Sequence, residues 1–275
     1  MRREKIFLTD QIDRLGNFAG RIGRHVRASL MTLGDIAGLL TQSLEAVASL
    51  RFQARRRIFT ELFKRQLYNT GVQAVLITCC LALVLALTLV NQLVKVTENP
   101  ELMARFYCWV VVRDLGPLMA GLVLISRSAT AVTHELGYLQ LNNELDTLAA
   151  QGISPAFAFF LPVVFAFPLS LFLLIIYFDL SFLVGGWLYF FWFVPGGQSF
   201  VGLFSHVADQ LVLYDLVVVA VKAVAIGTVA GLACLRSGCS VGKRFTDISH
   251  ALTGSTTSLL LTTFALNFGL TLVAY

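Results

Sequence analysis

Three charged side chains lie inside a segment that is otherwise apolar, and their chemistry is the first clue to a function. Arg113, Asp114 and Arg127 all fall within Phe106–Thr133. An ionised side chain in an apolar segment of membrane-spanning length is costly, and it usually faces protein or water. Arg113, beside Asp114 at a cavity entrance, could bind a phosphate through paired donors. Snorkelling to the membrane surface, with local ion pairs, explains the same residues equally well.

Other residues could belong to the same cavity. Leu89, Leu93 and Val96 share one helix face at positions i, i+4 and i+7, and they could supply part of an apolar wall, although such a stripe also suits ordinary packing. Lys222 is a further isolated cation, which we expect either to pair with Asp215 or to snorkel.

The sequence shows no local motif for catalysis or metal binding, although residues distant in sequence could still converge in space. Cys234 and Cys239 lack partners at metal-ligand spacing, and no Ser/His/Asp constellation is evident. Gly238–Arg244 reads GCSVGKR, but a phosphate-binding loop needs four residues between its glycines and a Ser or Thr after the lysine. We therefore expect no cofactor on this chain and no ATP bound by it.

The composition places these residues in a membrane. Of 275 residues, 57 % are hydrophobic and only 13 % are charged, against about 25 % charged in a soluble domain. The mean hydropathy is +0.76. These values exclude a soluble globular enzyme, a disordered chain and a nucleic-acid-binding chain. The sequence predicts an all-α integral membrane protein, because backbone groups in lipid must form their hydrogen bonds internally.

Five segments are long and apolar enough to span a membrane, which takes about 20 residues. They are Gly71–Val94, Phe106–Thr133, Ala156–Val194, Leu216–Leu235 and Ile248–Tyr275. The third is 39 residues long and could cross once or twice. One crossing leaves 195–213, which has no Lys or Arg, outside and the basic residues 236–244 inside, as the positive-inside tendency requires. We therefore predict one crossing, with the surplus after Asp179 forming a bent or protruding extension.

The amino-terminal part is strongly basic. Residues 1–70 hold 13 of the 21 Lys and Arg and 6 of the 16 Asp and Glu, a net charge of +7. This segment belongs on the cytoplasmic side, which predicts a cytoplasmic amino terminus and, after five spans, an outer carboxyl terminus. An apolar stripe at helical spacing predicts an interfacial amphipathic helix before the first span. Its members are Ile22, Val26, Leu30, Leu33, Ala37 and Leu40.

The connection His134–Pro155 between the second and third spans is acidic, although a short cytoplasmic loop is normally basic. Leu141, Leu145 and Leu148 define one helix face, and Gly152 with Pro155 would end that helix. A short acidic helix there would suit docking of a cytoplasmic partner. A solvated surface helix is the alternative.

Four motifs in this order resemble the MlaE permease family of bacterial lipid transporters. They are RQLYNTG (Arg65–Gly71), RDLGP (Arg113–Pro117), SRSATAVTHELG (Ser126–Gly137) and NELDTLAAQGISP (Asn143–Pro155). The resemblance runs from about Phe63 to the carboxyl terminus. Asp114 stands where the family usually has Glu, and Asn267 where Asp is common.

The resemblance implies a homodimeric five-span permease of the inner membrane that forms a phospholipid cavity at the subunit interface. It also implies two partners, a cytoplasmic ABC ATPase carrying ATP and magnesium and a periplasmic lipid-binding protein of the MCE type. Arg113 and Asp114 would match the family's polar pair at the lipid cavity. The residues that would couple to the ATPase are Glu135, Gly137, Glu144, Asp146, Gly152 and Pro155.

We accordingly expect a basic helical segment over residues 1–65 and a permease domain over residues 66–275, moving phospholipids between the inner and outer membranes. Two alternatives remain at this point. One is an intramembrane enzyme that modifies lipids, with Asp179 or His206 in catalysis. The other is a passive membrane scaffold.

Overall fold

The computed structural model describes residues 53–96, 100–193, 200–241 and 245–274, together with Gly38 and Thr41. These residues form helices and connecting turns, without a β-strand among them. Apart from Gly38, the predicted amphipathic helix over residues 22–40 lies outside the described residues, as does most of the expected segment 1–65.

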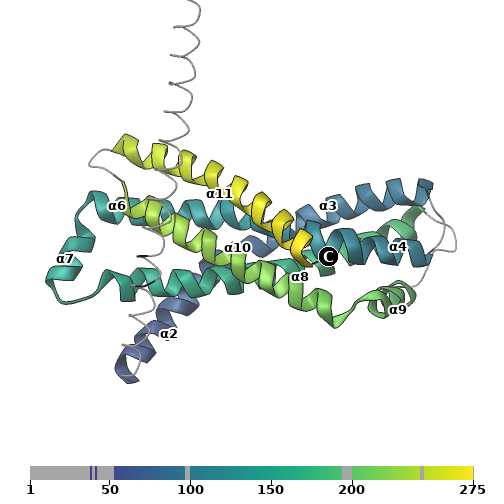
Figure 1. Ribbon diagram of the computed structural model, residues 1–275, viewed down its shortest axis with the longest axis horizontal. Helices are drawn as coiled ribbons and strands as arrows, with labels where there is room; N and C mark the ends of the chain where they lie inside the picture. Colours follow the sequence, from purple (N-terminus) through teal and green to yellow (C-terminus); the bar gives the residue numbers. More distant parts are fainter. Residues whose placement is uncertain are drawn as a thin grey trace, which may run out of the picture.

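Five helical segments are long and apolar enough to cross a membrane, which confirms the number of spans expected by length and composition. They are Arg56–Val96, Leu102–Leu141, Ala156–Phe193, Leu213–Cys239 and Leu252–Ala274. The first joins α2 (Gln53–Leu67) to α3 (Gln73–Val96) through a π-helical turn, and the last two lie in α10 (Leu213–Cys239) and α11 (Phe245–Ala274). All five run along the length of the molecule (Figure 1).

The 39-residue apolar run forms one helical segment. A π-helical turn, Ala156–Phe160, leads into α8 (Leu161–Phe193), which continues past the internal Pro168. The part after Asp179 does not protrude from the bundle but packs against α3, because glycine lets the two backbones approach. A Cβ atom added at Gly185 would lie 2.7 Å from the Cβ of Ala86.

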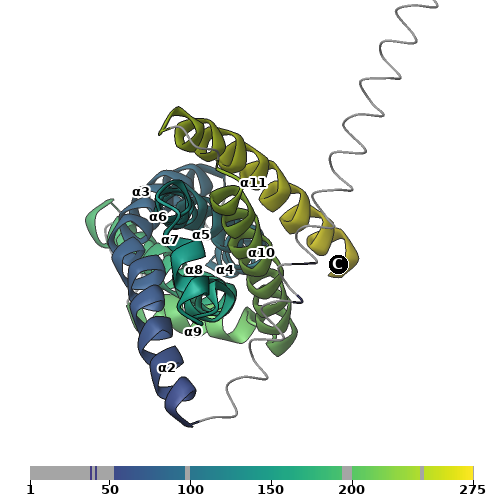
Figure 2. The ribbon, with the colours of Figure 1, turned by 90° about the vertical axis from the view of Figure 1, so that its left-hand side faces the viewer.

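The third span lies at the centre of the bundle, as the end-on view in Figure 2 shows. Within an apolar stretch of 18 residues taken from each span, 61 % of residues are buried in the third span, 22 % in the first and 17 % in the fifth. Phe167, Leu171 and Leu174 of α8 are fully buried in the main core cluster. Few residues of the first and fifth spans are therefore fully buried within this chain.

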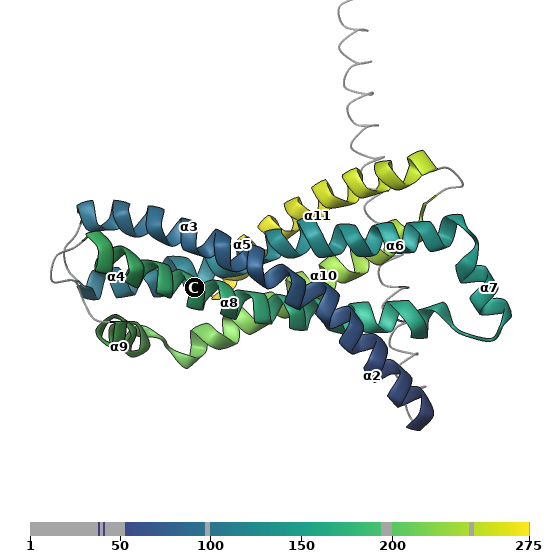
Figure 3. The same cartoon turned by 180° about the vertical axis from the view of Figure 1, so that it is seen from behind.

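Short helices close the two ends of the bundle (Figures 1 and 3). At one end, α7 (Glu144–Ala150) connects the second span to the third. At the other end lie α4 (Pro100–Phe106) and α9 (Phe200–Gln210). The helix α9 falls in the segment expected only as an outer loop. Its Val207 is buried against Ala104 and Leu183.

Candidate functional site

The second span is not a regular α-helix, and its irregular turns carry its charges. It runs from α4 through a π-helical segment, Tyr107–Leu115, into α5 (Gly116–Val123). A second π-helical segment, Leu124–Ala129, leads into α6 (Thr130–Leu141). The first segment holds Arg113 and Asp114, and the second holds Arg127. Such π-helical segments within α-helices are rare, and they frequently occur at functional sites.

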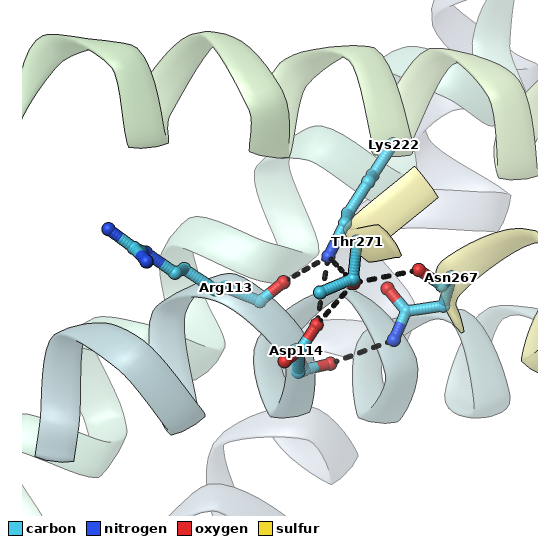
Figure 4. Close-up of polar contacts among 5 residues, drawn as sticks. All are labelled: Arg113, Asp114, Lys222, Asn267 and Thr271. Atoms are coloured by element: carbon cyan, nitrogen blue, oxygen red, sulfur yellow. Dashed lines mark hydrogen bonds and ion pairs between the residues drawn. The ribbon is translucent and has the colours of Figure 1, made fainter. Parts of the chain in front are cut away.

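Lys222 of α10 is fully buried and forms the centre of a polar cluster (Figure 4). Its Nζ atom donates to Asp114 Oδ1 at 3.0 Å, to Thr271 Oγ1 at 2.8 Å and to the carbonyl oxygen of Arg113. An ammonium group has three donors, so all three are used. The lysine therefore neither snorkels nor pairs with Asp215. Those two residues are seven apart, about 10.5 Å along the helix, so Lys222 binds a neighbouring span instead.

The fifth span is attached to the second through the same carboxylate. The Thr271 hydroxyl lies 2.6 Å from Asp114 Oδ1, and the Asn267 amide donates to the Asp114 carbonyl oxygen at 3.4 Å. We call Asp114, Lys222, Asn267 and Thr271 the Lys222 cluster. It joins the second, fourth and fifth spans. The side chain of Asp114 is nevertheless 42 % exposed.

Arg113 points away from its neighbour Asp114 (Figure 4) and forms a separate ion pair. Its Nη2 atom lies 2.8 Å from Asp215 Oδ1, and the two side chains are 20 % and 2 % exposed. The guanidinium carbon also lies 5.8 Å from the centre of the Trp109 ring. From the sequence we expected Arg113 and Asp114 to act as one polar pair. The structure places them in two ion pairs that face different partners, joined through the Arg113 backbone.

Two of the three predicted wall residues line an apolar pocket of about 470 Å³ near α4 and α9. Leu89 and Leu93 contribute to it from α3, and Tyr107, Phe182 and Leu203 contribute from other elements. Val96 is 84 % exposed and is not among its lining residues, and neither are Arg113 and Asp114. Within this chain, the apolar and polar residues that we expected at a single cavity therefore do not line the same pocket.

The connection at the opposite end differs from the expected single helix. Glu135 and Gly137 belong to α6, which ends at Leu141, and Glu144 and Asp146 form the first turn of α7. Between these helices Asn143 has φ of 55°, a left-handed conformation that breaks the predicted Leu141–Leu148 periodicity. The two acids of α7 are both exposed.

The end of α7 follows the expectation. Gly152 has φ of 79°, and the Ile153 amide donates to the Leu148 carbonyl at 3.0 Å, which closes the last turn. Gly152 is exposed and Pro155 is half-buried just before the third span, whereas Gly137 in α6 is buried.

The two residues considered for catalysis, Asp179 and His206, do not line the apolar pocket and do not belong to the Lys222 cluster. Asp179 packs against Gly116, where an added Cβ would meet Asp179 Oδ1 at 2.7 Å, and His206 lies on α9. Neither side chain makes a hydrogen bond or ion pair with another described residue. Within the described ranges no three His, Cys, Asp or Glu side chains come close enough to hold a metal ion.

The sequence did not identify Thr271 as part of the site. The hydroxyl of a threonine in an apolar helix commonly forms a hydrogen bond with the backbone of that helix. The presence of a threonine at this position therefore does not indicate a polar site. Lys222 and Asp215 were visible as charges in apolar surroundings, but their partners were not.

The chain matches a family model described as Permease MlaE over residues 63–273. The match includes both ion pairs, the apolar pocket and α7.

Proposed function

The chain belongs to the MlaE permease family, and we infer that this membrane permease of a lipid ABC transporter moves phospholipids between the inner and outer membranes of a bacterium. It would work as a homodimer with a cytoplasmic ATPase, which carries ATP and magnesium, and with a periplasmic lipid-binding protein of the MCE type. The chemistry is conformational, since no bond of the lipid is broken on this chain.

The exposure of Asp114 is the observation that carries the proposal. A carboxylate within a span is costly to place against hydrocarbon, yet this side chain is 42 % exposed while its partner Lys222 is fully buried. Its open side must therefore face water or another protein surface. A polar cavity between two copies of the chain supplies both.

The burial of the spans favours the same assembly. The first and fifth spans are the least covered within one subunit, and the Lys222 cluster connects the fifth span to the second. A second copy against these spans would enclose Asp114. The apolar pocket beside Leu89 and Leu93 would then accept acyl chains, while the polar groups near Arg113 and Asp114 face the phosphate.

The orientation in the membrane also belongs to this proposal. The basic residues before the first span favour a cytoplasmic amino terminus and an outer carboxyl terminus. The helix α7 would then face the cytoplasm, where Glu144 and Asp146 are exposed to an ATPase. Gly152 and Pro155 would fix the angle at which α7 meets the third span. Glu135 and Gly137 would brace α7 from the end of α6.

Co-purification tests the assembly. A tagged chain extracted gently from native membranes should bring down a second, differently tagged copy, an ABC ATPase and an MCE-type protein. The complex should hydrolyse ATP without changing the lipid chemically. A chain that purifies alone and hydrolyses or modifies added phospholipid would instead be an enzyme, and the proposal would be wrong.

A further inference from the structure

A second pocket, of about 460 Å³, lies between α2, α6 and the start of the third span. It shares no lining residue with the apolar pocket near α9 or with the Lys222 cluster. Most of its lining is apolar, including Val132, Phe159 and Val163. Three polar side chains also line it. They are Arg65, Gln66 and Glu135.

These three side chains have unused capacity to bind a ligand. Arg65 and Glu135 are exposed, and neither forms an ion pair or hydrogen bond through its side chain with another described residue. They carry opposite charges in one pocket but do not pair with each other. The Nε2 atom of Gln66 is buried and has no acceptor, which is unfavourable for a donor in a folded protein. An anionic group beside Arg65 and Gln66, joined to a cationic group beside Glu135, would satisfy all three.

The position of the pocket along the spans sets the kind of molecule that fits. Arg65 lies six residues before the uncharged run that starts at Gly71, and Glu135 lies two residues after Thr133, where the second apolar run ends. Phe159 lies near the start of the third apolar run. The charges are therefore at the level of lipid headgroups, while the apolar lining extends toward the hydrocarbon.

We propose that this pocket binds a zwitterionic aminophospholipid of the surrounding leaflet. Its phosphate contacts Arg65 and the Gln66 amide, its ammonium contacts Glu135, and its acyl chains lie over Phe159 and Val163. An anionic phospholipid with a glycerol headgroup has no ammonium group and leaves Glu135 beside a negative headgroup. The pocket therefore prefers the zwitterion. This lipid is a resident ligand rather than cargo, and its binding does not depend on the proposed transport function.

Native mass spectrometry of the full-length chain, purified and delipidated in detergent, tests the proposal. The probes are dioleoyl-phosphatidylethanolamine and dioleoyl-phosphatidylglycerol, titrated separately without ATPase. We expect phosphatidylethanolamine to bind more tightly, and we expect Arg65→Gln or Glu135→Gln to weaken it about tenfold, since each removes one charge-assisted contact. Glu135→Lys should reverse the preference in favour of phosphatidylglycerol.

Matched controls lie on the same helix. Lys64 and Glu61 are exposed, pair with each other at 3.5 Å and do not line the pocket. Lys64→Gln and Glu61→Gln should therefore leave both affinities unchanged. Added phospholipid that also binds in the proposed transport cavity gives the same background in all variants, and thermal melting confirms that each variant is folded.

Equal affinity for phosphatidylethanolamine in the wild type, Arg65→Gln and Glu135→Gln would overturn the proposal. So would a site where Arg65→Gln weakens both lipids alike and Glu135→Gln changes neither, because such a site recognises phosphate alone. Neither outcome would bear on ATP-driven transport.

Discussion

The Lys222 cluster predicts an unequal effect when either member of its ion pair is neutralised. Asp114→Asn keeps the side-chain size but leaves the fully buried Lys222 without its counter-charge. Lys222→Met removes the cation and leaves Asp114, whose side chain is 42 % exposed and 2.6 Å from the Thr271 hydroxyl. An unpaired charge costs more free energy the more deeply it is buried, and Lys222 is the more buried of the two. Asp114→Asn, which leaves Lys222 unpaired, should therefore be the more destabilising change.

The magnitudes follow from burial. Removing one partner of a buried ion pair costs about 3–5 kcal/mol, the range we expect for Asp114→Asn. Lys222→Met leaves a half-exposed carboxylate with one remaining hydrogen bond, so we expect about 1–3 kcal/mol. At roughly 2–4 °C per kcal/mol, the melting temperature should fall by about 6 °C or more for Asp114→Asn. The double variant has no unpaired charge and should recover about 0.5–3 kcal/mol relative to the sum of the two.

Tryptophan fluorescence during heating in detergent measures these differences in one series. The control is Lys64→Met, which breaks the exposed pair with Glu61, where both side chains are more than 60 % exposed. Such a pair contributes less than about 1 kcal/mol, so this variant should melt close to the wild type. The reasoning is refuted if Asp114→Asn has the same melting temperature as Lys64→Met, or if Lys222→Met has a clearly lower melting temperature than Asp114→Asn.

The packing, the connection and the orientation each predict a further outcome. Gly227→Ala should lower the melting temperature by several degrees, because the new Cβ would lie 2.5 Å from the backbone of α8. Gly269→Ala, whose Cβ would have nothing within 4 Å, should leave the melting temperature unchanged, and equal melting temperatures of the two variants would contradict this packing. The double change Glu144→Lys with Asp146→Lys should leave a folded dimer but weaken its affinity for the ATPase, measured by co-purification. A lost charged contact costs about 1.5–3 kcal/mol, which corresponds to about one to two decades in affinity. Unchanged co-purification would show that α7 presents only a solvated face. Cysteine placed at Ser240 should react with an impermeant reagent only after the membrane is opened, and labelling of intact cells would reverse the topology.

Much of the fold follows from the sequence because hydropathy is a property of local composition. The five spans and the single long third helix could be predicted, since a membrane admits few alternatives to an uninterrupted helix. The glycine that ends α7 could be predicted as well, because φ of 79° at Gly152 is a conformation that glycine adopts readily.

The pairing of the charges could not be predicted, because it depends on how the spans rotate against each other. Arg113 and Asp114 are neighbours in sequence, but successive residues of a helix point in different directions, and the two pair with different residues of α10, Asp215 and Lys222. The π-helical segments were also invisible, since no residue type marks them. The break at Asn143 interrupts a leucine periodicity that, read alone, indicates one continuous helix.

The central claim is tested most directly by phospholipid transfer in proteoliposomes that contain this chain and the proposed ATPase, with an MCE-type protein as the lipid carrier outside. We predict labelled phospholipid movement that requires both ATP and this chain. Leu93→Trp, which fills the apolar pocket, should abolish most of it, while Val221→Trp, at an exposed position on α10, should retain it. ATP hydrolysis without lipid movement, or equal transfer by both variants, would contradict the account.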